Sequence, residues 1–359
     1  MVYYITRYTG NTEDAGTKAP NDIEAICKKN GWKEIRFINP SENKKSLIEK
    51  AKKIVVNINN WKKLSKIVTK GDFVLYQHPM YFGTKFANKY IPIFQKKGVK
   101  FVALIHDLES LRNLTTVTEE SKKSHVFGDL ILLKKFDYII AHNQKMKDYL
   151  THNGIDEQRI VCLGIFDYLC QTEFKTFQKT NSVNIAGNLD SNKCGYIYEF
   201  INDNPEIKVE LFGGNYVKNN VSSNLVYRGS FPPEEITGIL DGAFGIVWDG
   251  PTSKSCIGNT GNYLKYNNPH KTSMYLAAGI PVIVWEEAAI ARFVIENKVG
   301  ITVKSLKSLT NELNKVSVIE YDIMARNARN IGTLLRQGAY FQNAMERILV
   351  LDVGEKINE

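Results

Sequence analysis

The sequence predicts an α/β protein with two domains, each a doubly wound parallel sheet flanked by helices. A chain of 359 residues is too long for a single small core and suits two domains of about 150 to 200 residues each. Apolar segments of strand length alternate with helical stretches throughout, and several of these segments are nearly continuous apolar runs. Because ligands bind at the carboxyl ends of parallel strands, we expect the active site in a cleft where the two sheets face each other.

The first half of the chain, residues 1–170, is predicted to form the first domain. Its expected helices are Asn21–Asn30, Ser46–Asn57 and Tyr81–Lys97. Its expected strands are Val2–Arg7, Glu34–Ile38, Phe73–Tyr76, Phe101–His106, Tyr138–Ala141 and Arg159–Leu163.

The alternation starts again near Ser182 and predicts a second domain over residues 180–338. Residues 167–181 are polar and lack clear alternation, so we place the linker there. The last helix is expected from Ile319 to Leu349, with a break around Gly332–Gly338. The expected strands are Val183–Ala186, Lys208–Phe212, Leu225–Tyr227, Gly245–Trp248, Val282–Val284 and Ile301–Val303.

The composition is that of an ordinary globular protein, with 43% hydrophobic and 24% charged residues. No apolar run approaches the roughly 20 residues that span a bilayer, and the N-terminus lacks the pattern of a secretory signal. The five cysteines are scattered, with no C-x-x-C pair. We therefore expect reduced thiols and a cytoplasmic protein.

The net charge of +9 comes largely from lysine clusters in the first half of the chain. They lack aromatic interleaving and any known motif, so we do not expect nucleic acid binding. Solvated helix faces explain most of them. The alternative is peripheral attachment to an anionic membrane surface, on its inner face.

The segment Gly261–Trp285, GNYLKYNNPHKTSMYLAAGIPVIVW, predicts an anion-binding site. A polar loop leads into a short helix, Thr272–Ala278, whose first backbone N–H groups and dipole attract negative charge. Such a helix start can hold a diphosphate without a metal, and the alternative is an ordinary loop, helix and strand. The polar residues at this helix start are Asn268, His270, Lys271, Thr272 and Ser273.

This segment resembles the nucleotide-sugar-binding region of GT-B glycosyltransferases, in which a helix of small residues ending in G-x-P-V-I abuts the donor diphosphate. The run K-Y-N-N-P-H-K-T-S-x-Y-L-A-A-G-x-P-V-I-V-W is similar to bacterial glucosyltransferases that extend O-GlcNAc on serine-rich-repeat adhesins. Galactofuranosyltransferase-like enzymes of surface polysaccharide synthesis share much of it. The resemblance is strongest over Gly258–Gly300, and the whole chain fits the family's length and layout.

The resemblance implies a GT-B architecture of two Rossmann-like domains and transfer of a hexose, glucose or galactose/galactofuranose, from a UDP-sugar. The implied acceptor is a hydroxyl of a glycan, glycopeptide or lipid-linked saccharide. The family also implies that the C-terminal helix, about residues 340–359, crosses back onto the first domain, and that the protein self-associates. No cofactor is expected besides the UDP-sugar as co-substrate.

The second domain should bind the donor. Gly187 and Asn188 follow its first strand, and Lys193 precedes the next helix, so the backbone can approach a ligand and the lysine can reach a phosphate. Phe212 and Gly213 end the next strand and would suit a uracil ring. The alternatives are a simple strand-to-helix turn and a core phenylalanine.

Further donor contacts are expected at the ends of two other strands. Asp249 can accept a hydrogen bond from a sugar or ribose hydroxyl, or can form an Asx turn into Pro251. The long loop Pro251–Asn268 suggests a flap that orders when donor binds. The family resemblance implies that a carboxylate after Trp285 contacts donor hydroxyls, and two candidates stand there, Glu286 and Glu287.

No metal site is visible in the sequence, because the Asp-x-Asp triplet of metal-dependent GT-A enzymes is missing. The helix start with Lys271 would instead stabilise the charge on the departing diphosphate. We therefore expect metal-independent transfer.

The acceptor and a general base should belong to the first domain. Asp107 and, second, His106 follow an apolar strand and would face the cleft, although Asp107 could instead cap the next helix. His78 ends the neighbouring strand and Asp14 lies in the loop after the first strand, so both are rival bases. In that loop Gly16 and Thr17 could approach the sugar closely, and a plain surface loop is the alternative.

Two other functions compete with sugar transfer. A UDP-sugar epimerase shares the two-domain architecture but takes no acceptor. A degenerate, non-catalytic glycosyltransferase-like partner subunit would typically have lost the phosphate-binding lysine or the glutamates. Here Lys193, His270, Lys271 and Glu286 are all present, which favours the active transferase.

Overall fold

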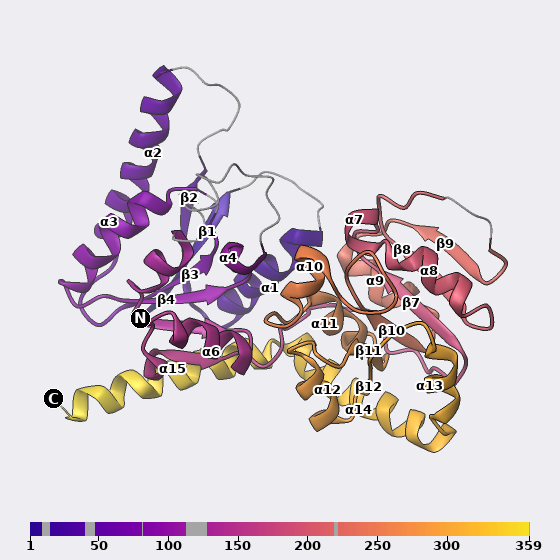
Figure 1. Cartoon of the computed structure of the whole chain (residues 1–359). Helices are drawn as coiled ribbons and strands as arrows, with labels where there is room; N and C mark the ends of the chain where they lie inside the picture. Colours follow the sequence, from indigo (N-terminus) through magenta and orange to yellow (C-terminus); the bar gives the residue numbers. More distant parts are fainter. Residues whose placement is uncertain (9–14, 40–46, 81, 113–127, 219–221, 359) are drawn as a thin grey trace. The chain divides into compact units, whose positions relative to one another are not determined.

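The computed structural model describes residues 1–8, 15–39, 47–80, 82–112, 128–218 and 222–358. They form two compact units, each built on its own parallel sheet (Figure 1). The predicted α/β class with two doubly wound sheets is therefore confirmed. Unit 1 comprises Met1–Ala141, Lys147–Cys162 and Ala344–Glu359, and unit 2 comprises His142–Met146 and Leu163–Asn343.

Unit 1 contains a six-stranded sheet in which all strands are parallel. Its strands are β1 (Val2–Tyr8), β2 (Lys33–Ile38), β3 (Phe73–His78), β4 (Lys100–Ile105), β5 (Tyr138–Ala141) and β6 (Ile160–Cys162). Their order is β2-β1-β3-β4-β5-β6. The central strands β3 and β5 are buried at every position, which explains why they read as continuous apolar runs.

The helices of unit 1 pack on this sheet through aromatic and amide contacts. Trp61 stacks on Tyr90 with 5.5 Å between ring centroids, and its ring meets the edge of Phe37 on β2 at 5.4 Å. Asn60 pairs with both backbone polar groups of Ile38, at 3.0 Å each. The helices that contribute to this unit are α1 (Ala15–Lys29), α2 (Leu47–Ser65), α3 (Thr84–Gln95), α4 (Glu109–Arg112), α6 (Gln144–His152) and α15 (Ala339–Asn358), with a 3-10 turn at Glu157–Arg159.

The last turns of α15 lie against the amino-terminal edge of the first sheet. Asp352 accepts a hydrogen bond from the Tyr138 hydroxyl at 3.3 Å and lies 3.6 Å from the Lys100 ammonium. These contacts explain why the segment from Ala344 belongs to unit 1.

Unit 2 repeats the architecture with a second six-stranded parallel sheet. Its strands are β7 (Ser182–Ala186), β8 (Lys208–Phe212), β9 (Leu225–Gly229), β10 (Phe244–Val247), β11 (Val282–Trp285) and β12 (Gly300–Val303). Their order is β12-β11-β10-β7-β8-β9. Each of the twelve strands expected from the sequence is present, with ends shifted by at most two residues.

The helices of unit 2 enclose a single apolar core that runs through both faces of this sheet. They are α7 (Ser191–Cys194), α8 (Tyr196–Asp203), α9 (Pro233–Ile239), α10 (Gly258–Tyr263), α11 (His270–Ala277), α12 (Ala291–Asn297), α13 (Leu309–Lys315) and α14 (Val318–Gln337).

The predicted break in the last helix occurs at one residue, Gly338, which has a φ of +82° and separates α14 from α15. Gly332 lies inside α14, so the expected break does not begin there. A Cβ atom on Gly332 would lie 2.3 Å from the Leu276 carbonyl oxygen. This glycine therefore lets α14 approach α11 closely.

The segment 167–181, expected as a linker, contains neither helix nor strand and packs within unit 2. The Arg336 guanidinium lies 3.7 Å from the centre of the Phe174 ring and donates to the carbonyl oxygens of Thr172 and Ala277. Thr172 also shares a 2.7 Å hydrogen bond with Thr237. The segment was expected to link the two domains, and these side chains hold it against α9 and α14 of unit 2.

Candidate functional site

In unit 2 the strand order reverses beside β7. The chain moves from β7 to β8 on one side and later places β10 on the other. Open α/β sheets bind ligands at the carboxyl end of such a switch point. Here Gly187 and Asn188 follow β7, and Asp249 is the second residue after β10.

Three charged side chains gather at this switch point. Lys271, from the first turn of α11, places its Nζ 2.8 Å from Asp249 Oδ1 and 3.1 Å from the Trp248 carbonyl oxygen. Lys193 of α7 lies 3.9 Å from Asp249 Oδ2. The side chains of Asp249 and Lys271 are 9% and 14% exposed, and that of Lys193 is 35% exposed. Two cations share one carboxylate, which leaves an excess of positive charge suited to an anion.

The surroundings determine the protonation states in this cluster. Burial alone would lower the pKa of Lys271, but the Asp249 carboxylate outweighs it and the pKa is raised above the ordinary lysine value. Burial raises the pKa of Cys194, beside these charges, to about 11. Lys271 is therefore a cation and Cys194 a neutral thiol at neutral pH.

The loop before α11 is fixed by Asn268, whose side chain and backbone make four hydrogen bonds inside unit 2. Its backbone N–H donates to His142 Nδ1 at 2.9 Å, and its amide donates to the carbonyl oxygens of His142 and Gly164 at 2.7 and 2.9 Å. Its Oδ1 accepts from the Asn143 amide at 2.7 Å. The sequence suggested a donor contact for Asn268. In the structure its polar atoms instead define where the helix begins.

The first turn of α11 also carries His270, Thr272 and Ser273. The His270 ring packs 5.0 Å from the Tyr168 ring, and its Nε2 lies 3.3 Å from the Asp167 carbonyl oxygen. The hydroxyl oxygens of Thr272 and Ser273 are buried and have no hydrogen-bond partner among the described residues. Buried polar groups normally have partners, so these two hydroxyls mark the helix start as unusual.

Glycine backbone lines the carboxyl ends of β7 and β8. Gly187 and Gly213 have φ angles of +121° and +142°, and a Cβ on Gly213 would lie only 1.7 Å from the Gly187 carbonyl oxygen. The neighbouring Phe212 ring is buried against Phe231. The flat aromatic surface expected from Phe212 is therefore part of the core, and the edge presents backbone instead.

The two glutamates after β11 are both exposed but differ in their contacts. Glu287 forms a 2.9 Å ion pair with Lys265, whose ammonium also lies over the Trp285 ring. Glu286 has no ion pair or side-chain hydrogen bond within the described part of the chain. Glu286 is thus the carboxylate that remains available to a ligand.

The start of the loop Pro251–Asn268 is anchored to α8. Glu199 accepts hydrogen bonds from the Ser253 backbone N–H at 2.9 Å and from the Thr252 hydroxyl at 2.7 Å, and these donors lower the pKa of Glu199. The loop then forms α10, where a Cβ on Gly261 would lie 2.9 Å from the Asp249 carbonyl oxygen. That this loop orders on donor binding stays a prediction.

In unit 1, polar residues collect at the carboxyl ends of β3 and β4. His106 Nε2 lies 2.7 Å from Gln77 Oε1. The Asp107 carboxylate accepts a 2.8 Å hydrogen bond from Arg112, and its side chain is 27% exposed. The Ser110 N–H in the first turn of α4 donates to Asp129 at 2.9 Å, whereas Asp107 is held by a guanidinium and keeps part of its carboxylate exposed.

The other predicted residues of unit 1 are placed differently. His78 is almost fully buried, with its Nε2 3.1 Å from Asp129 Oδ1. Gly16 and Thr17 lie in the first turn of α1, which begins at Ala15, and not in a loop that continues to Asn21. Asp14 lies outside the described residues.

Sequence reasoning missed three residues that orient the predicted ones: Arg112, Asp129 and Glu199. Asp129 is separated from His78 by 51 positions, so no local spacing could connect them. Arg112 follows Asp107 by five positions across the start of α4. For Arg112 alone a local signal was available, namely a charge opposite to that of Asp107 five positions away.

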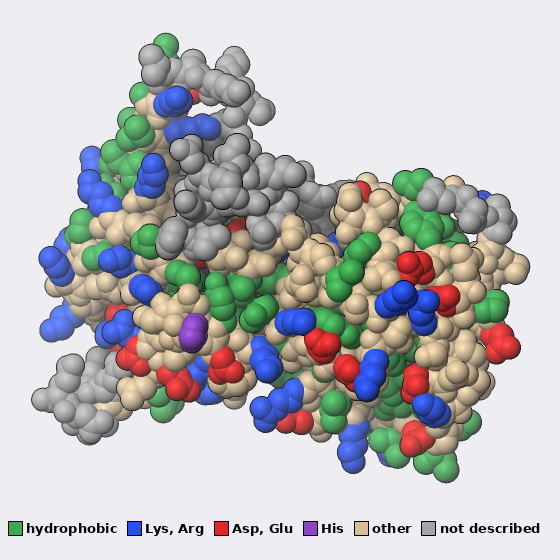
Figure 2. Space-filling model, in the orientation of Figure 1, with side chains coloured by type: hydrophobic (Ala, Val, Ile, Leu, Met, Phe, Trp, Pro, Cys, Tyr) green, Lys and Arg blue, Asp and Glu red, His purple; other side chains and the backbone are tan. Residues whose placement is uncertain are grey.

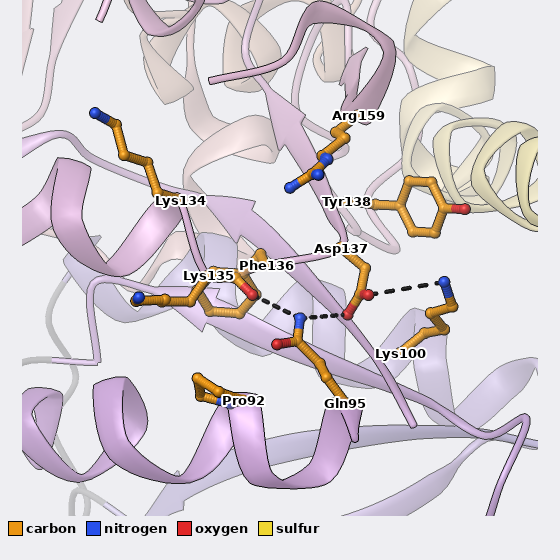
Figure 3. A pocket seen from close by; sticks show the side chains of 9 residues that line it. All are labelled: Pro92, Gln95, Lys100, Lys134, Lys135, Phe136, Asp137, Tyr138 and Arg159. Atoms are coloured by element: carbon orange, nitrogen blue, oxygen red, sulfur yellow. Dashed lines mark hydrogen bonds and ion pairs between the residues drawn. The ribbon is translucent and has the colours of Figure 1, made fainter. Parts of the chain in front are cut away.

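A hollow of about 440 Å³ lies at the opposite, amino-terminal edge of the first sheet (Figure 3). Its carboxylate, Asp137, is already bound by Gln95 at 2.9 Å and the Phe101 N–H at 2.7 Å. Its other charged side chains are surface cations, such as Lys134 and Arg159. This hollow is not part of the candidate site, because parallel sheets bind ligands at the other edge.

In the described ranges, no three His, Cys, Asp or Glu side chains gather in a way that could hold a metal ion. Within the same ranges, no helix combines the length and the apolar character needed to cross a bilayer.

Comparison with known proteins identifies relatives of this chain. Beta-1,6-galactofuranosyltransferase WbbI of Escherichia coli is 34% identical over 257 residues, which cover 70% of this chain and 71% of the relative. Glucosyltransferase 3 of Streptococcus gordonii is 25% identical over 93% of this chain and 94% of its own. Among solved structures, Anabaena HepE in complex with UDP and glucose has a TM-score of 0.61 at 10% identity, covering 98% of this chain and 99% of that one.

The family models match almost the whole chain. The N-terminal domain model of the glucosyltransferase 3-like family matches residues 2–165, and its C-terminal domain model matches residues 183–348. The resemblance stated from the 258–300 segment is therefore confirmed, together with the GT-B fold. This chain belongs to the glucosyltransferase 3-like family and is a glycosyltransferase.

Proposed function

We propose that this chain transfers a hexosyl group from a UDP-sugar to a hydroxyl of a glycan acceptor without a metal ion. The observation that carries the proposal is the cluster of Lys271, Lys193 and Asp249 at the switch point of unit 2, next to the start of α11. A helix start and a lysine together suit a diphosphate. The similar fold of HepE, whose structure holds UDP and glucose, supports the same class of donor.

The cluster would act most strongly when the bond to the leaving group breaks. As the anomeric carbon separates from the diphosphate oxygen, negative charge grows on UDP. Lys271 and the first N–H groups of α11 would stabilise that charge, which lowers the barrier. Lys193, the more exposed cation, would add to the attraction from the β7 side.

The rest of the donor would lie along the same sheet edge. The glycine backbone at Gly187 and Gly213 permits close approach of the nucleoside, and Asn188 is exposed beside it. Glu286 would accept hydrogen bonds from sugar hydroxyls, because among the described residues it forms no ion pair, unlike Glu287. Glu287 would contribute less while it is paired with Lys265.

The names of the relatives support a proposal for the transferred sugar, and the resemblance of the 258–300 segment supports one for the acceptor. One is named as a galactofuranosyltransferase and another as a glucosyltransferase, so we infer glucose or galactose/galactofuranose as the transferred sugar. We infer a protein-linked GlcNAc or a surface-polysaccharide intermediate as the acceptor. The name of WbbI specifies a β linkage, and a β linkage formed from an α-linked UDP-sugar requires inversion at the anomeric carbon.

Inversion requires a base that removes the proton of the acceptor hydroxyl. We assign this role to Asp107, because a base must touch its substrate and this carboxylate is partly exposed at the carboxyl edge of the first sheet. His78 is too deeply buried for direct contact. His106 is the second candidate, with one ring nitrogen already engaged by Gln77.

The composition of the chain and the inferred acceptor also suggest where the reaction takes place. We place the protein in the cytoplasm, with peripheral association to the inner face of the membrane, where lipid-linked acceptors are found. We also propose that it forms homo-oligomers and does not bind nucleic acid.

Calorimetric titration with UDP, several UDP-sugars, GDP and NAD, with and without EDTA, tests the proposal. We expect binding of UDP and one UDP-sugar that EDTA does not change. Loss of binding in EDTA would contradict metal independence. Binding of no nucleotide would favour a non-catalytic partner subunit, and conversion of a UDP-sugar to its epimer without an acceptor would favour the epimerase.

A further inference from the structure

The amino-terminal half of α2 exposes a group of aliphatic side chains that the proposed reaction does not use. Ile48, Ile54 and Val55 are 70%, 50% and 54% exposed, and every position from 48 to 56 is exposed or half-buried. The carboxyl-terminal half is anchored instead, with Asn57, Trp61 and Leu64 buried. The sheet of unit 1 therefore holds one half of the helix and leaves the other half in contact with solvent.

The exposed aliphatic residues lie on one side of the helix. Ile48, Ala51, Val55 and Ile58 follow the spacing of three and four residues that places side chains on a common face, and Ile54 lies beside them. Ordinary surface helices turn such a stripe toward the core. Here the opposite face, at Asn57, Trp61 and Leu64, is the one that packs on the protein.

Lysines surround this stripe. The sequence of α2 contains five lysines and a single acidic residue, Glu49. Lys50 and Lys52 are exposed among the aliphatic residues, and Lys62 and Lys63 are exposed one or two turns later. Exposed lysines continue on α3, whose Tyr90 stacks on Trp61 of α2. Figure 2 shows hydrophobic and basic side chains interspersed over the helix.

We propose that this face of α2 docks onto an anionic lipid bilayer, with the aliphatic side chains in the interface and the lysines on the phosphate groups. An amphipathic helix with aliphatic residues on one face and lysines around them is the usual means of peripheral attachment. A second copy of the chain is the less suitable occupant, because two such faces would bring their lysines together. The proposal does not depend on the donor site, which lies in unit 2.

Co-flotation of the full-length chain with vesicles tests the proposal. One set contains phosphatidylglycerol and phosphatidylcholine in equal parts, and the other contains phosphatidylcholine alone. We expect binding to the first set only, weakened by added salt. Lys52→Gln should weaken binding about fivefold, because a lysine near an anionic surface contributes about 1 kcal/mol.

The aliphatic stripe is tested with the double variant Ile54→Asp/Val55→Asp, which should lose at least about tenfold in affinity for the anionic vesicles. The matched control is Ile295→Asp, which alters a single isoleucine of α12 that is 60% exposed in unit 2. The control should bind like the parent chain. All three variants should keep the parent's melting temperature and UDP affinity, so a failure here is distinct from a failure of the donor site.

Three results would overturn the proposal. They are equal binding to both kinds of vesicle, unchanged binding by the double variant, and no vesicle binding by the parent chain. In the last case, sedimentation velocity would show whether the face joins two copies, since the double variant would then turn a dimer into a monomer.

Discussion

Replacing Lys271 with methionine removes the charge at the start of α11 while keeping a side chain of similar length. In the parent chain its Nζ donates to Asp249 at 2.8 Å and to the Trp248 carbonyl oxygen at 3.1 Å. A diphosphate bound there would become its strongest partner. We expect Lys271→Met to weaken UDP binding. We also expect a loss of stability, part of which comes from the Asp249 carboxylate that remains buried without this lysine.

The two effects have different magnitudes. A hydrogen bond to a charged group contributes about 1.5–3 kcal/mol, which corresponds to a loss of about ten- to hundredfold in UDP affinity. Removing one partner of a buried ion pair costs about 3–5 kcal/mol of stability, because the remaining charge stays buried. We expect the lower end of that range, since Lys193 is only 3.9 Å from Asp249 and both partners keep some exposure.

A double variant separates these two effects. Lys271→Met/Asp249→Asn also removes the Asp249 carboxylate that the single variant leaves without its lysine. The melting temperature should therefore return toward that of the parent chain. UDP affinity, measured by calorimetry, should stay low because the cation is still missing. Lys315→Ala, an exposed lysine of α13, is the matched control and should change neither quantity. If the double variant regained UDP affinity, Lys271 would be a structural residue and the donor-site assignment would be refuted.

Two further substitutions test a candidate residue in each unit. Asp107→Asn should lower turnover about a hundred- to ten-thousandfold with UDP affinity unchanged, and loss of both together would indicate a structural role instead. Gly213→Ala should lower the free energy of unfolding by more than about 3 kcal/mol, because its Cβ would meet the Gly187 carbonyl oxygen at a φ of +142°. Gly214→Ala, where a Cβ meets no atom within 4 Å, is its control and should stay within about 0.5 kcal/mol in denaturant titrations.

The sequence was most informative where one local pattern determined the outcome. Apolar runs such as Phe73–Tyr76 predicted buried parallel strands, because a strand covered on both faces admits few polar residues. The loop and helix at Lys271 predicted a short helix that begins in polar residues and ends before Gly279, because that spacing is contained in one short segment. That this helix start binds an anion stays a prediction.

Local patterns did not predict the surroundings of a segment or side chain where residues distant in the sequence contact it. The polar segment 167–181 was expected to be a linker, and Arg336, more than 150 positions away, holds it within unit 2. Phe212 was predicted to provide a flat surface for the uracil ring of the donor, but Phe231 packs against its ring. In both cases the deciding partner comes from another element, and its position follows from the topology and not from spacing along the chain.

The position of Lys271 is itself determined by residues that never touch a ligand. Tyr275, one turn further along α11, accepts a hydrogen bond from the Ala186 N–H at 2.9 Å and donates to the Asn184 carbonyl oxygen at 3.1 Å. Its ring occupies the space beside Gly245, where a Cβ would lie 2.2 Å from a ring carbon. Because Tyr275 ties α11 to the end of β7, the ammonium of Lys271 and the backbone beyond β7 are held in one geometry. Charge stabilisation of a leaving group depends on such preorganisation, so the core around Tyr275 would support the proposed donor site.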